Sequence, residues 1–354
     1  MNYFKKDDLI STLKGHTPFL ELKSGESVTF ISEYGGRVLG VFPKQNCVNL
    51  LWVNPKIKET IRDGQWNIGG DRYWISPERP FFYKHPESWK DWFCPNGLDP
   101  ANYKITASST NSCVLSSNIS LTNQQNQENY EGIMNRYISL VREPIKTGLP
   151  YCGVQYIENC ALATPNLKIN GWSLAQIISG GIDNPGTVLI PVKRNVKPLS
   201  YFRTIPTDRL KLKSNYIAYK IDVSDIYKLA IRPQDIDFNL PAKIGYILKI
   251  PKSNEYGFLI KLSSDIPKTQ KECFDISRDH PDSEIGVVQS YNSESPNKSE
   301  LMFGEIELQL ASFETVYNSS QSSSRHQLFG YIGTKEEILK VVETYLKISK
   351  PELY

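Results

Sequence analysis

The residues best suited to chemistry are concentrated in one segment of two dozen residues. It runs from Gly69 to Trp92 and reads GGDRYWISPERPFFYKHPESWKDW. An adjacent acid and base, Asp71 and Arg72, precede a Pro-Glu-Arg-Pro corner and a run of aromatic rings. Of the chain's six tryptophans, those in the segment or just before it are Trp52, Trp66, Trp74, Trp89 and Trp92. Flat rings beside charged hydrogen-bonding groups are the components of a site for a polyhydroxylated ligand.

A sugar presents an apolar face of C–H groups and an edge of hydroxyls. Indole offers the apolar face a rigid surface with one donor. Arg and Asp offer the hydroxyls charge-assisted hydrogen bonds, roughly twice as strong as neutral ones. The alternative interpretation is that these rings only pack the core, because aromatic residues dominate core burial in proteins. Since Gly, Pro and paired charges are typical of shaped loops, we expect a binding loop here.

A second informative pattern is the sequence LMFGEIELQL, from Leu301 to Leu310. Side chains alternate between the two faces of a strand. We therefore expect Met302, Ile306, Leu308 and Leu310 on one side, and Glu305, Glu307 and Gln309 on the other with Leu301 and Phe303. A carboxylate on such a partly enclosed surface could have a raised pKa and act as a general base. The alternative is an outer face in contact with solvent.

The chain has four histidines. His85 lies inside the aromatic segment, and His326 follows Arg325 in a predicted loop after the Glu305–Gln309 strand. Both are candidates to donate or accept a proton at neutral pH. His16 and His280 are expected to be structural or exposed.

Two basic residues at the starts of predicted strands are further candidates. Arg37, in EYGGRVLGVF, follows a Gly pair that permits a tight turn. Lys243 begins a strand in PAKIGYIL, where contact with solvent is the ordinary alternative. The chain has no G-x-S-x-G, P-loop, G-x-G-x-x-G or H-E-x-x-H pattern, so a nucleotide site and a zinc hydrolase lose support.

The elements that must position these residues are mostly strands. Short runs rich in β-branched and aromatic residues alternate with Gly, Pro, Asn or Ser clusters, which predicts an all-β sandwich. The clearest runs are Ser27–Ser32, Arg37–Phe42, Asn135–Val141, Thr187–Val192, Lys243–Ile250 and Tyr256–Leu262. The polar stretches Ser120–Gly132 and Asn318–His326 are predicted loops.

One helix is strongly indicated near the C-terminus. Thr334 and Glu337 form a capping-box pattern ahead of apolar residues at helical spacing, so we expect a helix over about residues 335–348. A short helix is expected over about residues 8–13. Without an internal repeat or a boundary signal, the prediction is a single domain over residues 1–354.

Composition excludes several classes of protein. A net charge of +3, from 41 basic and 38 acidic residues, gives no nucleic-acid footprint. Six scattered cysteines without a C-x-x-C spacing predict free buried thiols in a reducing compartment, and neither a metal nor a cofactor is predicted. Without an apolar leader or a long apolar run, we expect a cytoplasmic protein without a membrane segment, or a secreted one if a leader has been removed.

With these residues in view, the chain resembles the galactose mutarotase-like superfamily. GGRVLGVF looks like that superfamily's early strand pair. The stretches Gly69–Glu78, Asn170–Ile177 and Phe303–Gln309 are similar to a bacterial branch of it that carries the motif GGDRxWxxPE. The resemblance runs from about Ser27 to Tyr345. It implies a large antiparallel β-supersandwich with a concave sugar-binding face and a C-terminal helix.

Mutarotases interconvert sugar anomers: a carboxylate takes the proton of the anomeric hydroxyl while a histidine protonates the ring oxygen. The resemblance places the carboxylate at Glu307, with Glu305 as its rival. Where mutarotases have an Asn-His pair, this chain has Asn170-Gly171-Trp172, so the acid is sought in His85 or His326. The residues expected to bind substrate are Arg37, Asp71, Arg72, Trp74, Glu78, Trp172, Gln176 and Lys243.

Three functions follow as hypotheses. The first is a carbohydrate-converting isomerase of the aldose 1-epimerase type. The second is a non-catalytic carbohydrate-binding or sensing module, which the missing Asn-His pair favours. The third and weakest is a polysaccharide lyase-like enzyme, in which tyrosine and arginine move the proton. Each has a carbohydrate as its partner, and the sequence indicates no oligomeric state.

Overall fold

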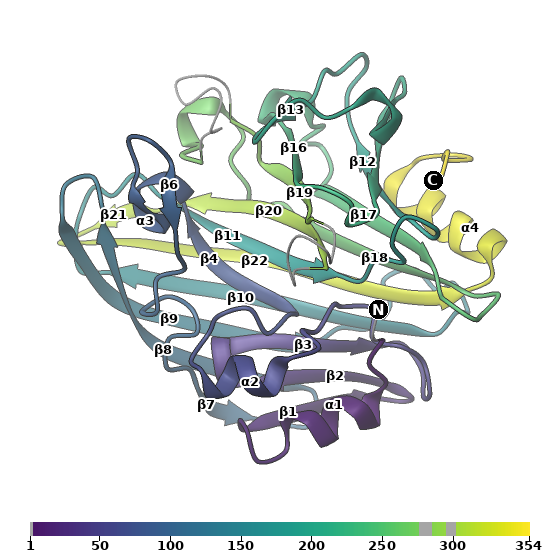
Figure 1. The fold of residues 1–354 in the computed structure, drawn as a ribbon, viewed down its shortest axis with the longest axis horizontal. Coiled ribbons are helices and arrows are strands. Elements are labelled where there is room, and N and C mark those ends of the chain that lie inside the picture. Colours follow the sequence, from purple (N-terminus) through teal and green to yellow (C-terminus); the bar gives the residue numbers. More distant parts are fainter. Residues whose placement is uncertain (1–2, 276–284, 295–301) are drawn as a thin grey trace.

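The computed structural model describes residues 3–275, 285–294 and 302–354. Within this described part, two large antiparallel sheets stack on each other, and a two-stranded hairpin lies beside them (Figure 1). The predicted fold class, a large antiparallel β-sandwich with a C-terminal helix, is confirmed.

The first sheet has nine strands in the described residues. Their order is β1 (Phe19–Ser24), β2 (Ser27–Ser32), β3 (Arg37–Phe42), β4 (Asp71–Ser76), β11 (Asn170–Ile177), β20 (Gly304–Ser312), β19 (Val288–Asn292), β16 (Tyr227–Ile231) and β13 (Leu199–Ser200). Strands β2 and β3 begin and end at the predicted residues. The centre of this sheet brings β4, β11 and β20 together from distant parts of the chain.

The second sheet has eleven strands in the same described ranges. Their order is β14 (Leu210–Leu212), β15 (Tyr216–Ile221), β12 (Gly186–Pro191), β17 (Ala242–Lys249), β18 (Tyr256–Ser263), β22 (Ser319–Gly333), β10 (Tyr151–Leu162), β9 (Glu128–Leu140), β8 (Ser112–Asn123) and β7 (Lys104–Ser108), with β21 (Glu314–Val316) paired to β22. The separate hairpin is β5 (Tyr83–His85) with β6 (Lys90–Trp92).

Two predicted loops are strands in the structure. Ser120–Gly132 forms the ends of β8 and β9 and the turn between them, and Asn318–His326 is largely the first half of β22. In β22 the even-numbered residues from Ser320 to His326 are buried while the odd-numbered ones face outward. Both faces carry polar residues, so the period-two alternation of a strand left no hydrophobic signal in the sequence.

The helices are α1 (Lys6–Leu13), α2 (Ile57–Arg62), α3 (Glu78–Phe82) and α4 (Lys335–Leu346). The predicted capping box begins α4: Glu337 N–H donates to Thr334 Oγ1, and Thr334 N–H donates to Glu337 Oε2. Buried residues of α4 pack on the outer side of the second sheet, against Phe258 and Phe329. The main hydrophobic core fills the space between the two sheets.

Candidate functional site

Strand β4 divides the acid–base pair found in the sequence. Asp71 points between the two sheets, where its carboxylate contacts Lys261 and Arg136. Its neighbour Arg72 points to the opposite side, with Trp74, because successive side chains of a strand alternate. We call this opposite side of the nine-stranded sheet the outer face.

Five adjacent strands contribute polar side chains to the outer face. The register places Gln176 beside Glu305, and Glu307 beside Gln289, across neighbouring strands. The residues on this face are Arg72, Trp74 and Ser76 from β4, Trp172 and Gln176 from β11, Glu305, Glu307 and Gln309 from β20, Gln289 and Tyr291 from β19, and Lys228 from β16. The predicted alternation is therefore confirmed over β20, with its carboxylates opposite Ile306 and Leu308, while Leu301 of the predicted pattern lies outside the described residues.

Aromatic rings line one end of the outer face. The Trp74 ring lies 5.8 Å from the Trp172 ring and 5.2 Å from the Trp66 ring, measured between centroids. The hairpin and α3 add Trp92 and Phe82 to this cluster. Trp92 is 40% exposed, whereas Trp172 is 2% exposed, so the cluster runs from the surface to the interior of the site.

Glu307 lies fully buried at the centre of the outer face. Its Oε2 accepts a hydrogen bond of 3.0 Å from Trp172 Nε1 and pairs with Lys228 Nζ at 3.1 Å. Burial raises the pKa of Glu307 to about 7, with a further rise from Glu305 and an opposing effect of Lys228. At neutral pH this carboxyl is thus divided between its two protonation states.

Glu305 is held differently from its neighbour on the strand. Arg72 Nη1 lies 2.8 Å from Glu305 Oε1, and the Arg72 guanidinium lies 4.1 Å from the centroid of the Trp74 ring. This ion pair with a stacked guanidinium holds the Glu305 side chain in place. Glu307 is the carboxyl suited to proton transfer.

Arg37 and Trp74 meet at a residue that the sequence did not indicate. Asp99 Oδ2 accepts from Arg37 Nη2 at 2.5 Å and from Trp74 Nε1 at 2.8 Å. Arg37 also donates to the carbonyl oxygens of Trp66 and Gly69. Arg37 therefore anchors the loop at this end of the outer face. All five residues that take part in these hydrogen bonds precede residue 100.

Polar atoms of the outer face remain without hydrogen bonds among the described residues. Gln309 Oε1 accepts from Ser76, and Gln176 Nε2 donates to Asn67, yet the other end of each amide has no partner. The buried atoms of this kind on the face that also lack an ion-pair partner are Arg72 Nε, Gln176 Oε1, Gln289 Oε1, Glu307 Oε1 and Gln309 Nε2. Each such group costs about 1–3 kcal/mol if it stays unsatisfied, and such groups are rare in native structures.

Five candidates from the sequence lie away from the centre of this face. His85 is on the exposed hairpin near Glu87 and Asp91. Lys243 Nζ donates to the carbonyl oxygen of Tyr345, 2.7 Å away, at the end of α4 on the other sheet. Asp71 and His326 lie between the sheets. Glu78, which accepts from Trp92 Nε1 at 2.8 Å, is at the edge of the aromatic cluster.

The charged residues between the sheets form what we call the interior network: Asp71, Arg136, Glu158, Lys261 and His326. Glu158 accepts from Arg136 Nε and Nη2 and lies 3.0 Å from His326 Nε2. Burial opposes ionisation of Glu158, yet Arg136 and His326 together outweigh it and lower the pKa of Glu158 to about 2. Burial also lowers the pKa of His326. With His326 neutral, the two acidic residues Asp71 and Glu158 balance the two basic residues Arg136 and Lys261. The network therefore joins the sheets without net charge.

Sequence reasoning did not select Lys228, Gln289 or Asp99. Lys228 lies within Tyr227–Ile231, where a single charge in an otherwise apolar strand was the available signal. Gln289 had no such signal, because its strand VQSYN carries other polar residues. Asp99 precedes Pro100 in a turn and had no signal, because its role depends on where the loop folds back.

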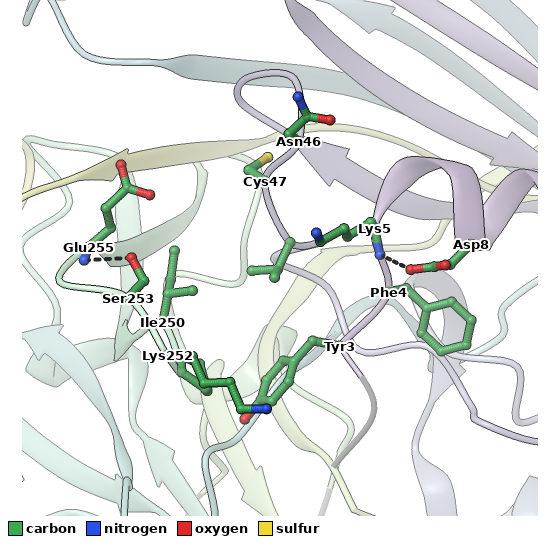
Figure 2. A pocket seen from close by; sticks show the side chains of 12 residues that line it. Tyr3, Phe4, Lys5, Asp8, Asn46, Cys47, Ile250, Lys252, Ser253 and Glu255 are labelled. Carbon is green, nitrogen blue, oxygen red and sulfur yellow. Dashed lines mark hydrogen bonds between the residues drawn. The ribbon is translucent and has the colours of Figure 1, made fainter.

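Two of the cavities formed by the described residues lie near the N-terminal segment. One of about 800 Å³ lies between the N-terminal segment and the turn after β17, and Figure 2 shows Tyr3, Lys5, Lys252 and Glu255 around it. The other, of about 710 Å³, shares Tyr3 and Lys252 with it. Neither contains a residue of the outer face. The described residues hold no group of three or more His, Cys, Asp or Glu side chains that could bind a metal, and all six cysteines are free and buried.

The described residues form an all-β sandwich of two large antiparallel sheets, with polar and aromatic side chains on the outer face. The chain belongs to a family of unknown function, DUF6786, whose model matches residues 2–353. No curated protein matches it. Among the described residues, no helix is both long and apolar enough to cross a membrane.

Several solved structures match most of this chain at low sequence identity. A galactose mutarotase-like protein from Lactobacillus casei ATCC 334 is 13% identical, with 89% of this chain and 100% of that chain covered and a TM-score of 0.47. A galactose 1-epimerase from Lactobacillus acidophilus NCFM is 10% identical, with coverage of 94% and 97% and a TM-score of 0.43. An aldose epimerase homologue from C. elegans is 9% identical, with coverage of 90% and 99% and a TM-score of 0.44. The likeness is one of fold.

Proposed function

We propose that the outer face binds a carbohydrate and interconverts its anomers, with Glu307 as the proton acceptor. The observation that carries the proposal is a set of buried, unpaired polar atoms around a carboxyl whose pKa is near neutral. Sugar hydroxyls both donate and accept, so they can satisfy the carboxylate and amide oxygens as well as the N–H groups of Arg72 and Gln309.

The aromatic cluster supports a sugar in preference to other polar ligands. Trp74 and Trp172 stand beside the polar groups and offer rigid apolar surface to the C–H groups of a pyranose ring. Trp92, exposed at the other end of the cluster, continues this surface to the solvent. Hydrogen-bonding groups at the centre with apolar rings at one end match the two sides of a sugar.

The environment of Glu307 supports proton transfer. A general base is most effective when its pKa is close to the working pH, and burial raises the pKa of Glu307 to about 7. Trp172 and Lys228 both occupy Oε2. Oε1, which has no hydrogen bond among the described residues, is therefore the atom that would accept the anomeric proton.

The test is anomeric exchange of aldoses and uronic acids, followed by NMR on the native protein and on Glu307→Gln. Loss of one general base costs about 10²–10⁴-fold in rate, and we expect a decrease of that size. Glu158→Gln is the matched control, because it also removes a buried glutamate from a central strand but leaves the outer face intact. Equal rates in the native protein and Glu307→Gln would refute a catalytic Glu307.

A non-catalytic binding module is the second candidate. It is favoured by the positions of the histidines: in the described part of the chain, His85 is exposed and His326 lies between the sheets, so neither reaches Glu307. Saturable sugar binding without exchange, retained in Glu307→Gln, would establish this function.

The lyase hypothesis is not proposed. Such an enzyme needs a tyrosine that loses its proton readily. Burial, followed by the charge of Glu305, raises the pKa of Tyr291 on the outer face, which opposes this role.

A further inference from the structure

We propose that Lys228 is the general acid of this site and gives a proton to the ring oxygen of the bound sugar. The inference rests on the proposed function and supplies the group that a histidine provides in mutarotases. Lys228 lies on β16 opposite Tyr291 of β19, and its side chain reaches across β19 to Glu307 on β20.

Three contacts fix the ammonium group in place. Nζ lies 3.1 Å from Glu307 Oε2 and 4.4 Å from the centroid of the Trp172 ring. The Phe202 ring lies 6.0 Å away. The side chain is 4% exposed, so water competes little for its donors. An ammonium has three N–H groups, and the ion pair with Glu307 occupies one of them, which leaves donors for a ligand.

The separation of Lys228 and Glu307 suits a reaction at one carbon. In a cyclic sugar, the anomeric O1 and the ring O5 are bonded to the same carbon, C1. An acid and a base that act on these two oxygens must therefore be neighbours. Glu307 Oε1 can face O1 while Lys228, bound to Oε2, faces O5.

The proton transfers balance. Glu307 Oε1 takes the proton of O1–H, the electron pair of that bond forms the C1=O double bond, and the C1–O5 bond breaks. Its electrons go to O5, which takes a proton from the Lys228 ammonium. The products are the open-chain aldehyde, a protonated Glu307 and a neutral Lys228. After rotation about C1–C2, the same steps in reverse close the ring as the other anomer.

The charges around Lys228 keep it protonated until it acts. Carboxylates face it from several elements: Glu307 and Glu305 from β20, Glu78 from α3 and Asp275 from the segment after the turn at Gln270–Glu272. Burial opposes the charged form of Lys228, yet these groups, led by Glu307, raise its pKa above the ordinary value. Arg72 is the other cation that acts on Glu307.

The experiment compares Lys228→Met and Lys228→Arg with the native protein. Anomeric exchange is measured by NMR and sugar binding by calorimetry. We expect about a 100-fold or greater loss of exchange in Lys228→Met with binding retained. Lys228→Arg keeps the charge but cannot give up a proton at these pH values, so its exchange should stay low as well.

Rescue and control variants separate proton transfer from a structural role. In Lys228→Ala, added primary amines should restore exchange at rates that depend on the pKa of the amine, which a packing role would not produce. Lys261→Met removes a different fully buried lysine from an ion pair with Asp71, and should keep native exchange at temperatures where it is folded.

The outcomes distinguish this inference from the proposed function. Native exchange rates in Lys228→Arg would overturn proton donation by Lys228, while a slow Glu307→Gln would still support the proposed function. If the native protein binds sugars but exchanges none of them, the proposed conversion and the role of Lys228 both fail. If Lys228→Met does not fold, Lys228→Arg and the amine series decide.

Discussion

Trp172 donates its indole N–H to Glu307 across neighbouring strands, at 3.0 Å. The register shift between Asn170 and Trp172 is a bulge, and the strand then continues with Trp172 opposite Gln309 of β20. A hydrogen bond to a carboxylate favours its charged form. Trp172 thus opposes the effect of burial on Glu307 and occupies Oε2.

Replacing this donor should raise the pKa of Glu307. In Trp172→Phe an aromatic ring remains but the N–H donor is lost. The effect of burial on the pKa of Glu307 then meets less opposition. The measurement is a ¹³C NMR titration of the glutamate carboxyls, with the Glu307 signal assigned from its absence in Glu307→Gln. Trp74→Phe is the control, since Trp74 donates to Asp99. An unchanged or lower pKa in Trp172→Phe would contradict this role.

Removing the neighbouring carboxylate should have the opposite effect. The charge of Glu305 contributes to the raised pKa of Glu307, so Glu305→Gln should lower that pKa from about 7. A lower pKa means more ionised base at pH 6, and the acidic limb of the exchange rate should move to lower pH. The same carboxyl titration and the pH profile of kcat/KM both report it. An acidic limb that moves to higher pH in Glu305→Gln would contradict this prediction.

The interior network predicts how stability changes in acid. Glu158 has a pKa of about 2 in the folded protein against an ordinary value of 4.5. Its folded-state pKa is the lower one, so its contribution of about 3 kcal/mol is present above pH 4.5 and is lost as the pH falls towards 2. Glu158→Gln should lower the free energy of unfolding at pH 7 by about 3–5 kcal/mol and flatten this pH dependence. Urea unfolding between pH 2 and pH 7 measures both, and exposed Glu314→Gln, which should retain the native curve, is the control.

Lys243 is expected to act on stability alone. Its ammonium donates to the last turn of α4, where the carbonyl ends of the helix carry partial negative charge. Lys243→Met should therefore lower the free energy of unfolding by about 1 kcal/mol, with sugar affinity unchanged. Urea unfolding and calorimetric titration test the two parts, and Lys340→Met on the exposed side of α4 provides the comparison. Loss of sugar affinity would restore Lys243 to the candidate site.

The parts of the fold that could be predicted are those with a hydrophobic signal. Strands β2 and β3 and the carboxylate side of β20 follow from apolar residues at period two. The same rule, applied to Asp71 and Arg72, separates them onto opposite sides of β4, although the sequence analysis assigned both to one site. The error was to expect a binding loop here, because the structure forms strand β4 over Asp71–Ser76.

The remaining differences arise from contacts between distant segments. His326 was expected in a loop because the serines before it hide the strand period, and its burial depends on pairing with β10. Lys228 and Glu307 are 79 positions apart, and the sheet order that brings them together through β19 is not encoded in either segment alone. Loop residues such as Asp99 are placed by the final packing, so no local pattern identifies them.

Because the outer face has unpaired polar atoms, binding of the ligand should raise the thermal stability of the protein measurably. A compound that pairs them stabilises only the folded chain, and at about 100 times its Kd the gain is roughly 2.7 kcal/mol. A collection of sugars can thus be ranked by melting temperature alone, without assuming any reaction. The increase in melting temperature caused by each sugar can then be compared between the native protein and Gln309→Leu or Gln289→Leu. A sugar whose effect is lost in one variant has hydroxyls that bind the strand carrying that residue.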